Sequence, residues 1–354
     1  MKKITFFIHN MYKMGGTERV VSLIANRLSK EYEVEIISLH KEYEKPFYKI
    51  EDNIKIRSIL GKELQPIKLY YPYLLHETRK FLKNYHTDVF ICAGMGDVGL
   101  TIFMHKRCKY IAWEHFYSNQ GKVGGVMWFG RVLSAKYADN IVVLTKKDME
   151  INIKRFKTLE KVVQIYNPFI FKANNKMYDI NSKKIVSCGR FTKQKGYDML
   201  IDVAEKVFSK HPDWIWDIYG DGEEMNNIKY LIERKHLENN VILKGRTNKM
   251  DDVYGEYAMF VLTSRFEGFA MVNIEAHNAK LPIVSFNCNC GPDEIIQEGI
   301  NGYLIECFDI DKMAEKINYL IENSDIRLKM SNNTMLDKEK LMMENVIDKW
   351  KEIL

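Results

Sequence analysis

Two glutamates eight residues apart, Glu267 and Glu275, flank a Gly-Phe-Ala turn in the segment 264–276. An apolar run precedes the turn and a helical pattern follows it, so Glu267 is expected in a loop above a sheet and Glu275 inside a helix. A carboxylate there is placed to bind a ribose, and backbone N–H groups at 268–271 are placed to bind a phosphate or a sugar hydroxyl. A hydrolytic carboxylate pair is the competing interpretation, but such pairs come from separate elements.

A basic loop, Gly-Arg-Phe-Thr-Lys-Gln-Lys-Gly, follows the apolar run 183–188. The Arg190 guanidinium is planar and can donate two parallel hydrogen bonds, and the Lys195 ammonium is a compact positive charge. Both groups are suited to binding a diphosphate. Taken alone, the loop fits an ordinary solvated basic segment equally well. The next apolar run ends in Gly-Asp-Gly at 220–222, a tight turn that is compatible with a nearby nucleotide but is common elsewhere.

The six cysteines are scattered and form no CxxC pair, so we expect buried thiols in a reducing compartment rather than a zinc site. No Asp-x-Asp pair follows a strand-like run, so we expect no metal site and no cofactor. The first apolar run, 4–8, is too short for a signal peptide. No window approaches the ~18 apolar residues of a membrane-spanning helix. These features predict a cytoplasmic protein.

Short apolar runs alternate with amphipathic patterns along the chain, at 4–8, 34–39, 89–93, 110–115 and 140–145, and again at 183–189, 214–220, 240–245, 259–264 and 281–286. Runs without polar alternation predict parallel strands buried on both faces. The polar segment 171–182 between the two series reads as a linker. The prediction is an α/β protein with two Rossmann-like, doubly wound domains, 1–170 and 171–336. The helical segment 337–354 fits either domain, and we assign it to the first.

The run SRFEGFAMVNIEAHNAKLPIVSF (264–286) resembles the E-x7-E signature of the family 4 retaining glycosyltransferases, which have the GT-B fold. Further segments resemble the family in the same order, from the Gly15-Gly16 loop and Tyr166-Asn167-Pro168 to GRFTKQKG, YGDGEE, LKGRTNKMDDVY, GPDEII and EGINGYLI. The resemblance covers nearly the whole chain. It implies that two Rossmann-like domains face a central cleft, the first binding the acceptor and the second a nucleotide sugar.

The resemblance also implies a role for each matching residue. Arg190 and Lys195 would bind the donor diphosphate, Glu275 the ribose, and Glu267 with the following amides the sugar hydroxyls. The turn 245–248 would contact the base, and His115 would lie at the reacting sugar, although a lone histidine is more often structural. The implied catalytic residues are His115, Arg190, Lys195 and Glu267, and the implied donor-binding residues are Gly16, Arg190, Lys195, Thr247, Glu267, Gly268, Phe269, Ala270 and Glu275.

Two segments depart from the family pattern. Residues 117–125 follow the histidine with an unusual sequence, so acceptor contacts cannot be transferred. The segment Cys-Asn-Cys-Gly-Pro at 288–292 stands where the family usually has a glycine-rich phosphate loop. The donor contacts of that loop are therefore not assigned to residues of this segment. The resemblance further implies a retaining, metal-independent hexosyl- or N-acetylhexosaminyltransferase, with a UDP-sugar as the commonest donor. The leaving phosphate would help to deprotonate the acceptor, without a protein nucleophile.

The charge distribution suggests the kind of acceptor. Residues 1–170 hold 28 Lys and Arg against 17 Asp and Glu, an excess that favours an anionic partner. Basic and aromatic residues interleave at 55–85, and the apolar stretch 126–133 beside Lys122, Arg131 and Lys136 fits a helix lying on lipid or, equally, an ordinary packed helix. We expect a saccharide or polyprenyl-diphosphate-linked acceptor and peripheral contact with anionic lipid at the inner face of the cell membrane. No nucleic-acid-binding motif is present.

Two other functions stay open. One is a nucleotide-sugar-binding partner subunit without catalysis, against which the joint presence of Arg190, Lys195, Glu267 and Glu275 argues. The other is a GT-B nucleotide-sugar epimerase, which would consume the donor without an acceptor.

Overall fold

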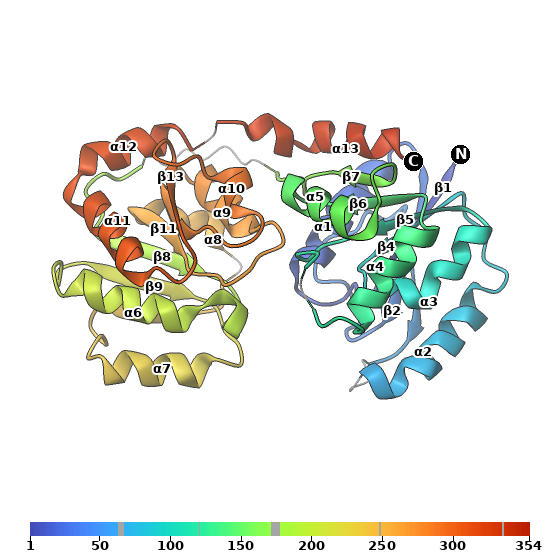
Figure 1. Ribbon diagram of the computed structural model, residues 1–354, viewed down its shortest axis with the longest axis horizontal. Helices are drawn as coiled ribbons and strands as arrows, with labels where there is room; N and C mark the ends of the chain where they lie inside the picture. Colours follow the sequence, from blue (N-terminus) through green and yellow to red (C-terminus); the bar gives the residue numbers. More distant parts are fainter. Residues whose placement is uncertain (63–66, 120, 171–177, 248, 335) are drawn as a thin grey trace. The chain divides into compact units, whose positions relative to one another are not determined.

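The computed structural model describes residues 1–62, 67–119, 121–170, 178–247, 249–334 and 336–354 (Figure 1). The chain divides into two compact units: unit 1 is Met1–Ile170 with Glu339–Leu354, and unit 2 is Phe171–Lys338. Most of the predicted linker, 171–177, lies outside the described residues. The helix at the end of the chain therefore belongs to the same unit as the first strand.

The sheet of unit 1 has the strand order β3-β2-β1-β4-β5-β6-β7, and its strand pairs are parallel. The strand order reverses between β1 and β4, which in doubly wound sheets marks the edge where ligands bind. The strands are β1 (Lys3–Ile8), β2 (Glu33–His40), β3 (Lys55–Leu60), β4 (Val89–Ala93), β5 (Lys109–Trp113), β6 (Asn140–Val143) and β7 (Val162–Gln164).

Helices of unit 1 cover this sheet because the strands are apolar on successive residues. Phe7 and Phe90 pack on one face with Leu74. The helices are α1 (Gly16–Leu28), α2 (Ile67–Leu82), α3 (Val98–Thr101), η1 (Ile102–Lys106), α4 (Val126–Tyr137), α5 (Lys146–Phe156), η4 (Lys338–Leu341) and α13 (Met343–Glu352). The C-terminal α13 is held to α1 by an ion pair of Arg27 with Glu344, whose nearest atoms are 2.6 Å apart.

The sheet of unit 2 is also parallel, with the order β10-β9-β8-β11-β12-β13. Its order reverses at β8. The strands are β8 (Lys184–Cys188), β9 (Ile215–Tyr219), β10 (Val241–Gly245), β11 (Met259–Leu262), β12 (Ile283–Phe286) and β13 (Gly302–Ile305). The helices are η2 (Lys193–Lys195), α6 (Tyr197–Phe208), α7 (Met225–Arg234), α8 (Met250–Val253), η3 (Tyr254–Glu256), α9 (Met271–Asn278), α10 (Pro292–Ile295), α11 (Ile310–Glu322) and α12 (Ser324–Asn332).

Neighbouring residues of one strand in unit 2 belong to different cores. Ile185 packs with α6, α7 and α11 on one face of the sheet, while Val186 packs with η3 and α9 on the other. Both faces are thus buried, and Figure 1 shows helices on either side of the sheet. Together the two sheets confirm the prediction of two Rossmann-like, doubly wound α/β domains. Among the described helices, none has both the length and the apolar character needed to cross a membrane.

Candidate functional site

A cation and a carboxylate meet at the carboxyl ends of β8 and β11. The Lys195 ammonium donates to Glu267 Oε1 at 2.7 Å, and the Ser264 hydroxyl donates to the same oxygen at 2.5 Å. The Lys195 and Glu267 side chains are only 16% and 7% exposed. Burial opposes the charge on Lys195, but the Glu267 carboxylate outweighs it and raises the pKa of Lys195 above its ordinary value. The lysine is therefore a fixed, largely buried positive charge.

The two loops that carry this pair are fastened to each other through their backbones. Arg265 N–H donates to the Gln194 carbonyl at 2.8 Å, and the Gln194 amide donates to the Phe266 carbonyl at 3.0 Å. Gly196, with φ +67°, lies so close to Thr263 that an added Cβ would be 2.2 Å from its carbonyl oxygen. Only glycine fits this position without strain. The backbones that carry Lys195 and Glu267 are thus held at a fixed separation.

Arg190 has the opposite character. Its side chain is exposed, and within the described part of the chain it forms no ion pair. Its loop is braced by the turn 220–222, because Phe191 N–H donates to the Asp221 carbonyl at 2.9 Å. An added Cβ on Gly220 would lie 2.0 Å from the Gly189 carbonyl oxygen. The structure therefore places an exposed guanidinium, without an ion pair among the described residues, on a braced loop that also leads to Lys195.

Glu275 is the fifth residue of α9 and is partly buried. The Tyr254 hydroxyl lies 3.4 Å from Glu275 Oε2 and 2.9 Å from the Cys188 sulfur. Burial, with the Glu275 charge nearby, raises the pKa of the Cys188 thiol to about 12, so the thiol stays neutral. The buried Tyr254 hydroxyl is accordingly placed to orient the Glu275 carboxylate.

The turn Gly268–Ala270 directly precedes α9, and its last residue, Ala270, has the left-handed conformation with φ +51°. The segment 288–292 packs against this turn: a Cβ added to Gly291, which has φ +100°, would lie 2.9 Å from the Phe269 carbonyl carbon. Cys288 and Cys290 are fully buried there, and burial raises the pKa of the Cys288 thiol. The segment 288–292, which departs from the family pattern, therefore packs against the turn 268–270 and supports it.

The loop after β10 lies beside the turn after β9. Gly220 N–H donates to the Gly245 carbonyl at 2.9 Å, and Arg246 pairs with Asp221 at 3.0 Å. The Thr247 hydroxyl accepts from Lys249 N–H at 3.1 Å. Asn248, the last residue of the predicted base-binding turn, lies outside the described residues. Among the described residues, no group of three or more His, Cys, Asp or Glu side chains could hold a metal ion.

The two remaining candidates, Gly16 and His115, belong to unit 1. Gly16 begins α1 after β1, and a side chain there would meet open space, so packing does not require a glycine. His115 follows β5 and is 8% exposed, with its ring centroid 4.3 Å from that of Trp113. Its Nε2 has no hydrogen-bond partner among the described residues. Burial lowers the pKa of His115 to about 3, so the imidazole is neutral at physiological pH.

The interpretation of α4 as a helix lying on lipid is wrong for part of its length. Arg131 is 3% exposed and forms an ion pair with the buried Glu114, at 2.6 Å between Nε and Oε2. Leu133 packs against the core of unit 1, and an added Cβ on Gly130 would lie 1.8 Å from the Met95 carbonyl oxygen. The helix therefore packs on its own unit, although Phe129 remains exposed.

Two site residues were missed from the sequence. Ser264 carried a weak signal, because it is a polar residue directly after an apolar run and three residues before Glu267. Tyr254 carried none, since it lies 21 residues from Glu275 and is an aromatic residue among core positions.

Comparison with known proteins places these features in a family. The family model for glycosyl transferases group 1 matches residues 171–336. An uncharacterized glycosyltransferase of Haemophilus influenzae is 34% identical over 360 residues, covering 100% of both chains. The amylovoran biosynthesis glycosyltransferase AmsD of Erwinia amylovora is 27% identical over 371 residues, also covering 100% of both. The solved structure of a mutant of S. aureus TarM, in complex with fondaparinux, alpha-GlcNAc-glycerol and UDP, is similar with a TM-score of 0.82 at 20% identity, covering 100% of this chain and 99% of that one.

Proposed function

Because the chain belongs to the group 1 glycosyltransferases of the GT-B fold and acts in polysaccharide or glycan assembly, we propose that it is a retaining, metal-independent hexosyl- or N-acetylhexosaminyltransferase with a UDP-sugar donor. The observation that carries this proposal is the cluster of Lys195, Glu267 and Ser264 at the carboxyl edge of the unit 2 sheet. Arg190, on the loop that leads to Lys195, is exposed and has no ion pair among the described residues. A diphosphate needs cations at that edge, and a sugar needs hydrogen-bond acceptors.

Each side chain has one task in this proposal. Arg190 and Lys195 neutralise the charge that grows on the diphosphate as the anomeric C–O bond breaks. Glu267 accepts hydrogen bonds from the sugar hydroxyls, and Glu275 from the ribose. The acceptor hydroxyl attacks from the face that the diphosphate leaves, and its proton passes to the departing phosphate oxygen. The neutral His115 is suited to a hydrogen bond with the reacting sugar and not to holding a charge.

The test is the anomeric configuration of the product. A panel of nucleotide sugars is first screened for thermal stabilisation, because a bound donor raises the melting temperature by mass action. The stabilising donor is then incubated with saccharide and polyprenyl-diphosphate acceptors. We expect a UDP-sugar to stabilise the protein and the linkage to keep the configuration of the donor. An inverted linkage contradicts retention, donor binding without any transfer indicates a partner subunit, and donor conversion without an acceptor indicates an epimerase.

Gly291→Ala tests the support of the donor turn. The added methyl group would push against the Phe269 backbone, so Glu267 and the following amides shift and the dissociation constant for UDP rises about tenfold or more. Titration calorimetry with UDP measures this change. Gly299→Ala is the matched control, because Gly299 also has positive φ but has open space around its added Cβ. UDP affinity equal to wild type in Gly291→Ala would show that the turn does not hold the donor.

For the acceptor we propose a lipid-linked sugar at an anionic membrane surface, with contact through α2 and η1 of unit 1. A pocket of about 510 Å³ is lined there by one apolar ring, Phe103, and by basic side chains, His76, Arg79, Lys80, Lys83 and Arg107. The guanidinium carbons of Arg79 and Arg107 lie 5.9 and 6.0 Å from the Phe103 ring centroid. Basic residues around an apolar patch favour the head-group region of a bilayer.

Vesicle sedimentation tests this surface. We expect binding at low salt to vesicles that contain anionic lipid, weak binding to neutral vesicles, and loss of most of the difference in Arg79→Ser/Lys83→Ser. Lys206→Ser/Lys312→Ser removes two exposed cations from unit 2 and serves as the control. Equal binding to both kinds of vesicle, or an Arg79→Ser/Lys83→Ser variant that binds like wild type, would exclude this surface.

A further inference from the structure

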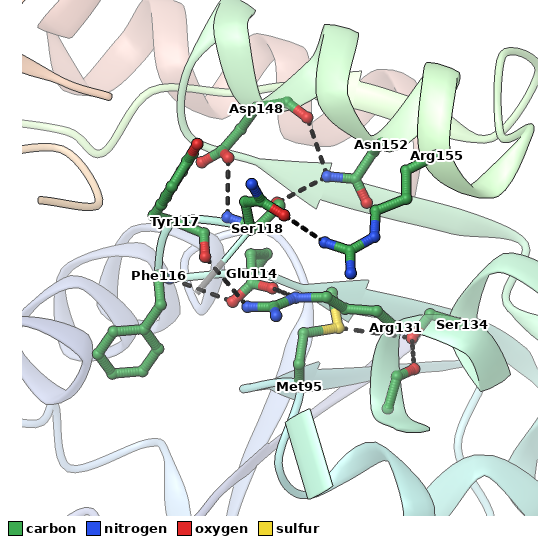
Figure 2. A network of polar contacts seen from close by, with 12 residues as sticks. Met95, Glu114, Phe116, Tyr117, Ser118, Arg131, Ser134, Asp148, Asn152 and Arg155 are labelled. Carbon is green, nitrogen blue, oxygen red and sulfur yellow. Dashed lines mark hydrogen bonds and ion pairs between the residues drawn. The ribbon is translucent and has the colours of Figure 1, made fainter. Parts of the chain in front are cut away.

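The loop that follows β5, residues 114–119, is fastened to its surroundings by the buried polar network of Figure 2. Glu114 N–H donates to the Val142 carbonyl at 2.9 Å and so prolongs the pairing with β6 beyond the end of the strand. Glu114 also accepts from Phe116 N–H at 3.2 Å through Oε1. The first turn of the loop is therefore closed on the Glu114 carboxylate.

Helix α4 holds the same carboxylate and the next part of the loop. Arg131 donates from Nε to Glu114 Oε2 at 2.6 Å and from Nη2 to the Tyr117 carbonyl at 3.2 Å. Both side chains of the pair are at most 3% exposed. Burial raises the pKa of Glu114 to about 6, although Arg131 opposes the rise, so the Glu114 carboxyl is mostly ionised at neutral pH. A single guanidinium thus joins two points of the loop.

Helix α5 holds the far end of the loop. Ser118 N–H donates to Asp148 Oδ1 at 2.9 Å, and the Asn152 amide donates to the Ser118 hydroxyl at 2.7 Å. Arg155 donates to the side chain of Asn119. Glu114, Tyr117, Ser118 and Asn119 are thus each fixed by a side chain of α4 or α5.

His115 and Phe116 are the exceptions within this loop. The Phe116 ring is 45% exposed and points away from the network in Figure 2. The His115 imidazole rests on Trp113, and its Nε2 lacks a hydrogen-bond partner in the described part of the chain. A buried nitrogen without a partner costs free energy, and a catalytic role is one of the reasons for which such a group is kept. The network therefore fixes a loop whose unsatisfied group is the histidine.

We propose that the buried Glu114–Arg131 ion pair is a positioning element for transfer, which fixes the 114–119 loop so that His115 Nε2 meets the reacting sugar. The inference rests on the proposed function. Glu114 and Arg131 themselves touch no substrate and act through His115. A displacement of about 1 Å at a reacting group is enough to lower the rate strongly, so a loosened loop reduces turnover while the donor still binds to unit 2.

The decisive variant is Glu114→Gln/Arg131→Met. Replacing a buried ion pair by neutral groups of similar size is often neutral or stabilising, whereas either single substitution leaves a buried charge unpaired. We expect the double variant to melt at or above the temperature of Glu114→Gln, with kcat lowered tenfold to a hundredfold and KM for the donor unchanged. Glu35→Gln is the control, since Glu35 is another buried carboxylate of unit 1, bound to Lys3 at 2.9 Å near the start of β2. It should lose stability and keep its kcat. A double variant with the kcat of wild type overturns the proposal.

A double-mutant cycle with His115 separates positioning from general stability. If the ion pair acts through the imidazole, Glu114→Gln lowers kcat in the wild-type background and has little further effect in His115→Ala. Equal factors in both backgrounds would show that the pair acts elsewhere.

Hydrogen exchange tests the same point without activity. Backbone amides at 114–119 should exchange at least tenfold faster in Glu114→Gln and in Arg131→Met than in wild type, and should be unchanged in Glu35→Gln. Unchanged exchange in all three variants overturns the inference. If wild type transfers sugar to no acceptor, the proposed function fails, and the exchange rates still decide whether the pair fixes the loop.

Discussion

Replacing Lys195 by alanine is expected to lower kcat about a hundredfold or more and to destabilise unit 2 as well. The ammonium is a preorganised charge beside the expected diphosphate, and such a group is worth roughly 3–4 kcal/mol in the transition state. Its removal also leaves the largely buried Glu267 carboxylate with one partner fewer, at a cost of about 1–3 kcal/mol in the free energy of unfolding. Initial-rate kinetics and chemical denaturation measure the two effects separately.

The double variant Lys195→Ala/Glu267→Ala isolates the effect on stability. It removes both charges, so we expect stability to return toward that of wild type while activity stays low. Lys193→Ala controls for the loss of one positive charge from the same loop, since Lys193 is exposed. Recovery of turnover together with stability would mean that neither Lys195 nor Glu267 takes part in the reaction and that their ion pair only supports the fold.

Arg190→Ala is expected to lower kcat by a similar factor of about a hundred without changing stability. The guanidinium is exposed and makes no ion pair within the described residues, so the folded state loses no ion pair when it is removed. The loss should therefore appear only when a diphosphate is present, as slower turnover and a weaker response of the melting temperature to UDP. The measurements are initial rates and thermal melting with and without UDP.

Lys193→Ala again serves as the control, with a wild-type rate expected. A drop in stability for Arg190→Ala in the absence of ligand would show an unrecognised structural contact. Near-normal rates in both Arg190→Ala and Lys195→Ala would remove the diphosphate assignment altogether.

The central strands of both sheets were predictable because they are continuous apolar runs, such as 89–93 and 183–188. Strand β3 was missed, since its Lys55 and Arg57 give it the composition of a charged surface segment. In the structure Arg57 pairs with the buried Glu35 of the neighbouring strand. Strand β13 was missed for another reason: it has four residues, Gly302–Ile305, and begins with a glycine.

The site was predictable as a set of residues but not as a set of contacts. The sequence indicated Lys195 for the diphosphate and Glu267 for the sugar, while the structure joins the two in one ion pair. That contact depends on β8 lying beside β11, and local patterns do not contain strand order. Arg131 shows the same limit, because helical periodicity does not distinguish an exposed arginine from one whose partner, Glu114, lies on another element.

Unit 1 is discontinuous along the chain, and this has a consequence for synthesis. The ring of Trp350 in α13 is fully buried and lies 4.8 Å, centroid to centroid, from the ring of Trp113, on which His115 rests. Unit 2 is one uninterrupted segment, whereas unit 1 lacks α13 until residues 339–354 have left the ribosome. During translation, the unit that carries His115 can therefore complete its packing only after the whole of unit 2 has been synthesised.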